Sequence, residues 1–299
     1  MKNNVTALEL AFIIFTVNLS QKVHALPSLL AYYSNESLWV SALINFILDG
    51  LLLIVVLKIL NDSKGISFYE YLTLKVGKFL AKVIVFTIVI FLIAKTFIPF
   101  LEQKNSVELT FYETQPSDLT YIPVYVLVFY IAYKGLTSFS KSVNIVVFAL
   151  ILGVITVLAL SLSAAEYYRV LPIFQVPIKT VLNGSFKTLL WFGDPLYLLF
   201  FSKKILKTEK LNLKISLGYI ISTLIFIGGL ITFYAVFEGL APRQYFAPLK
   251  MSKYSVTLSN IGRFDYFATL LIITANVYSL ALPLTISSSL LNEVFKSKN

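Results

Sequence analysis

The chain has 299 residues, of which 58% are hydrophobic and only 13% are charged. Apolar runs of helix length recur from end to end, which excludes a sizeable soluble domain and predicts one all-α integral membrane domain over residues 1–299. Cysteine is absent and histidine occurs once, so thiolate nucleophiles, disulfides and the common zinc signatures are excluded. No phosphate-cradling or dinucleotide-binding motif is present either, and we predict no enzymatic activity, no metal site and no cofactor.

The net charge of +10 does not indicate a nucleic-acid-binding protein. Lysine and arginine lie in short loops between the apolar runs, where positive charge normally orients helices in a membrane. Most of them share one side when both termini are cytoplasmic, including Lys2, Lys64, Lys207 and Lys298. We therefore expect a multi-pass protein of the cell membrane with lipid around it and cytoplasmic termini.

About eight transmembrane helices are predicted from runs that reach roughly 20 residues, and the fourth of them is short. The spans are 6–32, 38–60, 79–101, 119–134, 139–163, 180–204, 212–237 and 264–291. Residues 66–78 are too short to span and repeat apolar residues at helical spacing, so they predict a cytoplasmic interfacial helix.

The first span could instead be a secretory signal peptide, since an apolar stretch leads to a small-residue motif that resembles a cleavage site. Glu9 interrupts that apolar stretch, and Lys22 stands just before the possible cut. A retained, functional helix fits these two charges better.

Polar residues crowd the middle of the first span, where Asn18, Gln21, Lys22 and His24 precede Pro27. This pattern predicts an interrupted helix, because proline removes a backbone donor and polar groups in lipid need partners. The side chain of His24 could titrate near neutral pH, or it could serve as an ordinary structural donor.

The second span carries a polar stripe, because Ser41, Asn45 and Asp49 repeat every four residues and share one helical face. A carboxylate near mid-span is costly in lipid, so two interpretations of Asp49 remain open. It could be a proton or ion coupling site, or it could form a buried ion pair with Lys95 that fixes packing. Lys95 itself could point inward or extend toward its helix end.

The sixth span contains the most distinctive segment, in which Phe192, Gly193, Asp194 and Pro195 follow one another. Glycine loosens a helix, proline removes a donor and aspartate adds a charge, so the helix should break there. Broken helices at mid-membrane commonly mark binding sites. A simple proline kink with Asp194 as a helix cap is the alternative.

The last span also turns a polar face inward. Its members are Asp265, Thr269, Ile272, Asn276 and Ser279. Small and hydroxylated residues of this kind also serve ordinary helix packing in membranes.

The order and spacing of several segments resemble the endospore germination permease family, the B subunits of GerA-type nutrient receptors within the amino acid, polyamine and organocation transporter superfamily. The segments are YYSNESLWVSALI, SFYEYLTLKVGKFLAKVI, YKGLTSFSKSVNIVVF, LPIFQVPIKTVLNGSFKTLLWFGDPLYLLFF and IGRFDYFATLLIITANVYSLA. The resemblance implies a LeuT-like bundle with broken first and sixth helices around a midplane pocket, typically for an amino acid.

By position, the resemblance implies that the pocket is formed at 18–25 and 192–195, with Lys95 near a basic position of the third helix. Family members usually have ten helices, so the last two would be missing here. Lys22 and His24 stand where relatives are usually small, which implies that they fill the pocket or replace a bound cation.

Three functions follow from these observations. The first is a membrane subunit of a spore germinant receptor, in the spore inner membrane, that binds a small nutrient and signals to A-type and C-type partner subunits. The second is a proton-coupled secondary amino-acid transporter, in which Lys22 or Asp49 supplies the titrating charge. The third is a scaffold subunit whose pocket no longer binds a ligand.

Overall fold

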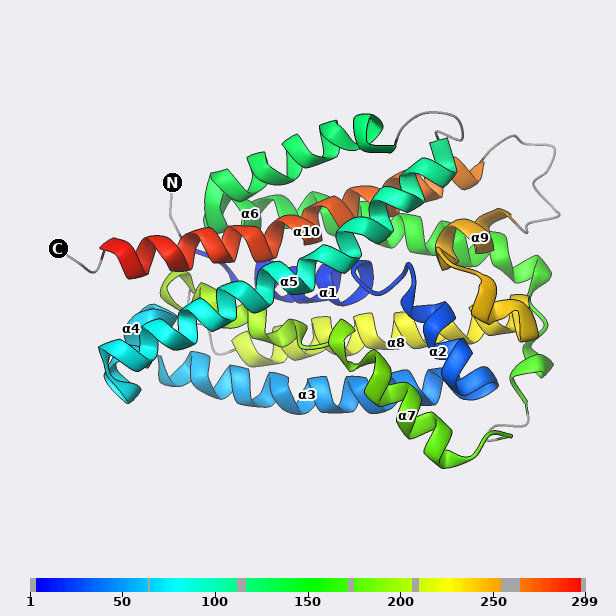
Figure 1. The fold of residues 1–299 in the computed structure, drawn as a ribbon, viewed down its shortest axis with the longest axis horizontal. Helices are drawn as coiled ribbons and strands as arrows, with labels where there is room; N and C mark the ends of the chain where they lie inside the picture. The colour runs from blue at the N-terminus through cyan, green and yellow to red at the C-terminus, as the bar shows by residue number, and fades with distance from the viewer. Residues whose placement is uncertain are drawn as a thin grey trace.

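The computed structural model describes residues 4–63, 65–111, 117–171, 175–205, 210–253 and 264–296, which form a bundle of elongated helices (Figure 1). Five helical stretches among these residues are long and apolar enough to cross a membrane. They are Leu26–Asp62, Lys78–Glu108, Tyr121–Ala164, Leu211–Arg243 and Tyr266–Phe295. The protein is therefore an α-helical, multi-pass membrane protein.

The first predicted span is divided into α1 (Ala7–Ser20) and α2 (Leu26–Ser34). Thr6 begins α1 with a capping box, since its side chain accepts the amide N–H of Glu9 while the Glu9 carboxylate accepts the N–H of Thr6. The chain then reverses, and α3 (Leu38–Asp62) runs back along the bundle.

Where an interfacial helix is predicted, the chain forms the short helix α4 (Phe68–Val76), which starts with a second capping box formed by Ser67 and Glu70. Gly77 follows in the left-handed region with a φ of 83°, a conformation that glycine adopts without steric cost. This residue turns the chain into α5 (Lys78–Phe111), which extends well beyond the span predicted at 79–101.

Two predicted spans lie within α6 (Ser117–Ser161), which is helical on both sides of Gly135. Gly135 has a φ of 77° and a ψ of 170°, so it is not helical itself. Figure 1 shows the chain folding back on itself there, so that the two limbs run in opposite directions. The limbs match the spans predicted at 119–134 and 139–163.

The span predicted at 180–204 is the most fragmented. It consists of α7 (Ile178–Thr188), the short 3-10 turn η4 (Leu189–Trp191) and the 3-10 helix η5 (Asp194–Lys204). Because the break splits the span, neither piece has the length of a membrane-crossing helix, although together they cover the expected distance.

The remainder of the chain contains two long helices and the short elements between them. These are α8 (Leu211–Phe237), η6 (Glu238–Arg243), α9 (Ala247–Lys253) and α10 (Phe264–Lys296). The helix α1 lies at the centre of the bundle, where it contacts α6, α8, α10 and η5. Large apolar side chains such as Ile54 and Phe79 are exposed on the outer faces, as expected of lipid-facing helices.

One end of the bundle collects α4, the start of α1 and the end of α10 (Figure 1). The amide N–H of Val5 donates to the carbonyl oxygen of Lys204 at 2.7 Å, and Lys203 pairs with Glu70 at 3.7 Å. This is the end predicted to be cytoplasmic. Of the lysines assigned to it, Lys2, Lys64, Lys207 and Lys298 lie outside the described residues.

Candidate functional site

The two predicted interruptions are both present. Residues 21–25 separate α1 from α2, and Pro27 stands in the first turn of α2, where its missing N–H costs no hydrogen bond. Phe192 and Gly193 separate η4 from η5, and Gly193 has a φ of 93°. A residue with a Cβ would be strained at that angle, so glycine is required for the second break.

The two breaks meet at a buried ion cluster centred on Asp194. Its carboxylate forms ion pairs with the ammonium groups of Lys22 and Lys95, the second at 2.9 Å. Lys95 also donates to the carbonyl oxygen of Phe192 at 2.6 Å, so it closes the second break from the side of α5. All three side chains are at most 5% exposed. In the described residues, η5 begins at Asp194 without a side-chain capping hydrogen bond, so the capping alternative is wrong. Lys95 points inward.

Lys22 lies in a cage suited to a primary ammonium group. Besides Asp194, it donates to the side-chain oxygen of Asn18 at 3.0 Å. Its Nζ lies 5.1 Å from the ring centre of Phe192 and 5.8 Å from that of Phe46, within the range of cation–π attraction. Asn18 is held in turn by α8, because its amide donates to Ser222 at 2.8 Å.

Asp49 does not pair with Lys95, which corrects the ion pair considered from the sequence. One of its carboxylate oxygens, Oδ1, accepts the amide N–H of Gly193 at 2.7 Å. The other, Oδ2, is buried and has no hydrogen-bond partner in the described part of the chain. The reason for the difference is that the break presents a free backbone donor to α3, while Asp194 attracts both lysines.

The polar stripe of α3 leads to the second break. Ser41 donates to the carbonyl oxygen of Val181 at 2.9 Å, and the side-chain amide of Asn45 donates to that of Ser185 at 3.0 Å. These bonds align α7 with α3, so that Asp49, the next stripe residue, reaches Gly193.

The polar face of α10 supports the first break in the same way. The side-chain amide of Gln21 donates to the carbonyl oxygen of Ser279 at 3.2 Å, and the ring of His24 hydrogen-bonds with the side-chain amide of Asn276. Both side chains therefore contact α10, and Gln21 also borders the small cavity beside Lys95. The bond to Asn276 gives His24 the role of a structural hydrogen-bonding residue. The side chain of Asp265 lies outside the described residues.

The two breaks differ in how their backbone groups are satisfied. Within the described residues, the amide N–H groups of Val23 and His24 form no hydrogen bond. His24 is buried and Val23 is half-buried. Unpaired backbone groups of this kind are tolerated in a membrane protein where they line a cavity or meet a ligand.

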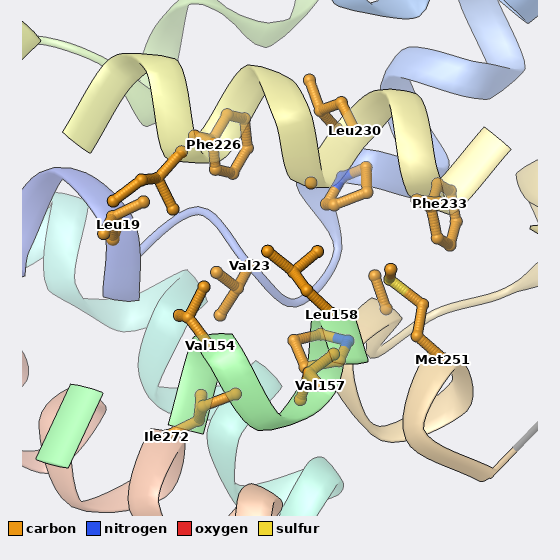
Figure 2. A pocket seen from close by; sticks show the side chains of 15 residues that line it. Leu19, Val23, Val154, Val157, Leu158, Phe226, Leu230, Phe233, Met251 and Ile272 are labelled. Carbon is orange, nitrogen blue, oxygen red and sulfur yellow. The ribbon is translucent and has the colours of Figure 1, made fainter. Parts of the chain in front are cut away.

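An apolar cavity of about 60 Å³ lies beside the first break. Figure 2 shows it between the interrupted first span, α8, the second limb of α6, α9 and α10. The labelled lining residues are Leu19, Val23, Val154, Val157, Leu158, Phe226, Leu230, Phe233, Met251 and Ile272. A dry cavity lined in this way accepts an aliphatic group and not a charge.

The ion cluster itself leaves little free space. The cavity bordered by Gln21, Lys95 and Trp191 has a volume of about 10 Å³, enough for roughly one water molecule. The structure is therefore closed at the meeting point of the two breaks, and a ligand would enter there only if side chains moved.

The sequence predicts Phe192 as a site residue, but it does not predict two other aromatic residues of the cluster, Phe46 and Tyr197. Phe46 and Tyr197 face the two ammonium groups, since the Nζ of Lys95 lies 5.4 Å from the ring centre of Tyr197. Both residues stand in apolar runs that contain many other aromatic residues, so the sequence carries no signal that distinguishes them.

Comparisons with known proteins identify the family of this chain. No curated protein matches the chain significantly. A model of the Spore_permease family, described as "Spore germination protein", matches residues 4–299. This match covers nearly the whole chain, so the protein belongs to the Spore_permease family of spore germination proteins.

Proposed function

We propose that the protein is the ligand-sensing membrane subunit of a spore germinant receptor. It binds a small nutrient, typically an amino acid, in the middle of a LeuT-like bundle and passes the signal to A-type and C-type partner subunits. Both termini face the cytoplasm, and the membrane is the inner membrane of the spore. The proposal extends the germination role of the family to recognition of the germinant itself.

The observation that carries the proposal is the meeting of two interrupted helices at Asp194. Half-helix ends present unpaired amide and carbonyl groups, which suit the carboxylate and the ammonium of an amino acid. The free N–H groups of Val23 and His24 are the candidate donors to the ligand carboxylate. The neighbouring apolar cavity is the candidate site for an aliphatic side chain.

In this mechanism Lys22 occupies the place of the ligand ammonium. Its Nζ already pairs with Asp194 and lies over the Phe192 ring. A germinant that brings its own ammonium to Asp194 displaces Lys22, which opens the contact between α1 and η5. Binding and displacement together shift the bundle between two states, and the partner subunits respond to that shift.

A proton-coupled amino-acid transporter is the second candidate, and Asp49 favours it. Its buried Oδ2, which has no hydrogen-bond partner among the described residues, is a place where a proton could be held and released. In that case the Asp49→Asn variant would lose transport driven by a pH gradient and retain ligand binding.

Retention of radiolabelled amino acids by sealed proteoliposomes under an imposed pH gradient separates these functions. For a receptor we expect label above that of protein-free vesicles and equal before and after the vesicles are permeabilised. Label that is lost on permeabilisation would support the transporter instead. No retained label for any amino acid would contradict both and favour a scaffold.

A further inference from the structure

A second cavity lies between the C-terminal part of α5 and the segment that joins η6 to α9. It has a volume of about 670 Å³, within the range of roughly 300 to 1,000 Å³ that small-molecule sites occupy. We call it the α5–α9 cavity. It is separate from the apolar cavity and from the ion cluster, and it shares none of their lining residues.

The two walls of the α5–α9 cavity carry opposite charges. On one wall, Glu102, Asn105 and Glu108 repeat every three residues along α5 and so share a helical face. The other wall carries Arg243 at the end of η6 and Lys250 in α9. The cavity therefore has an anionic and a cationic side.

These charges do not neutralise each other. In the described part of the chain, neither acid of the α5 wall forms an ion pair with Arg243 or Lys250. Opposite charges that face each other across a gap favour a molecule that carries both signs and spans the gap. A lone anion or a lone cation would satisfy only one wall.

The cavity also contacts the first helix break. The Glu102 carboxylate accepts the amide N–H of Ala25, the last residue of the break, at 3.4 Å. Phe246, which lines the cavity, has a φ of 61° and places its ring edge-on to His24, with ring centres 5.9 Å apart. A bulky residue in the left-handed region is strained, and such strain persists chiefly at ligand clamps and switches.

We propose that the α5–α9 cavity is a separate binding site for a small zwitterion such as a free amino acid. The ligand ammonium pairs with Glu102 and Glu108, and its carboxylate pairs with Arg243 and Lys250. The site rests on the proposed function in one respect, because it would collect the germinant and present it to the first break through Ala25 and Phe246.

The absence of cysteine from the sequence makes a single introduced thiol a clean reporter. Asn105→Cys places the thiol in the cavity, and Lys179→Cys places one on the exposed start of α7 as a matched control. Each full-length variant, in nanodiscs, is reacted with a maleimide in the presence of glycine, acetate or glycinamide. Glycine carries both charges, acetate only the negative one and glycinamide only the positive one.

We expect glycine, at about ten times its Kd, to slow labelling of Asn105→Cys by about tenfold, because only the unoccupied site reacts, and to leave labelling of Lys179→Cys unchanged. Acetate and glycinamide should protect much less. Adding Arg243→Gln and Lys250→Gln should abolish protection. Equal protection by all three compounds, or no protection by glycine, would overturn the proposal.

Adding Asp194→Asn to the reporter separates this site from the one at the helix breaks. Protection that survives Asp194→Asn supports an independent site, whatever that change does to binding at the ion cluster. Protection that disappears with Asp194→Asn but survives Arg243→Gln and Lys250→Gln would mean that glycine acts only at the breaks, and the α5–α9 cavity would then not be a site.

Discussion

The two helix breaks use different chemistry, although both interrupt a helix inside the same bundle. The second is held closed from within, since Gly193 donates to Asp49 and the carbonyl of Phe192 accepts from Lys95. The first leaves the amide groups of Val23 and His24 without partners among the described residues, and it borders an apolar cavity. The second break is thus closed by side chains from α3 and α5, whereas the first keeps backbone donors that the proposed ligand would use.

The largest effect should come from neutralising the Asp194 carboxylate at the centre of the ion cluster. Asp194→Asn leaves the ammonium groups of Lys22 and Lys95 buried without their counter-ion, so the free energy of unfolding should fall by about 3–5 kcal/mol. Thermal unfolding in nanodiscs, followed by tryptophan fluorescence, measures it. Asp62→Asn, at the exposed end of α3, is the control and should change stability by less than about 0.5 kcal/mol. Equal losses in the two variants would mean that the ion cluster does not stabilise the fold.

Replacing the ammonium that closes the two breaks tests whether Lys22 stands in for a ligand. Lys22→Ala should lose about 2–4 kcal/mol, because it creates a cavity and removes a buried charge partner. Propylammonium has the size and charge of the atoms removed and should recover much of the lost thermal stability. Propanol, which lacks the charge, should not. If both compounds act alike, the cage does not recognise ammonium.

A pair of glycines in α8 tests the free space beside the first break. A Cβ at Gly229, which lines the apolar cavity, would meet no atom within 4 Å, whereas one at Gly218 would lie 2.5 Å from the carbonyl oxygen of Ala11. Gly229→Ala should therefore stabilise the helix by about 0.5–1 kcal/mol, and Gly218→Ala should destabilise the bundle by about 1–3 kcal/mol. Differential scanning fluorimetry of the two variants measures the contrast, which would fail if both lost stability.

The smallest effect concerns an exposed ion pair at the end of η5, the surface counterpart of the buried cluster. The backbone N–H of Ser67 and the neighbouring Lys203 hold the pKa of Glu70 below its ordinary value of 4.5. The ionised form therefore stabilises the fold above pH 4.5, and this contribution disappears as the pH falls through the lower folded-state pKa. Because the pair is exposed, the contribution should be only about 0.5 kcal/mol.

Comparing the wild type with Glu70→Gln in unfolding experiments between neutral pH and acid measures that difference. The variant should match the wild type at acid pH and be less stable at neutral pH. An unchanged stability difference across the range would contradict the role given to Glu70.

Several site residues could be predicted because charged residues are rare inside apolar, membrane-spanning runs and so mark functional or structural positions. Lys22, Asp49, Lys95 and Asp194 all stand out as charges inside apolar runs, and all are buried near the breaks. Their partners could not be predicted. Whether Lys95 pairs with Asp194 or with Asp49 depends on the distances between α3, α5 and η5, and no local sequence pattern encodes these distances.

From sequence alone it is clear that the chain lies in lipid, that it is helical and where both helices break, because apolar length, proline, glycine and buried charge act locally along the chain. Only the packed structure shows that two lysines share Asp194 and that oppositely charged walls face each other across the α5–α9 cavity. These features join residues far apart in sequence, and their energies depend on separations that exist only once the helices have packed.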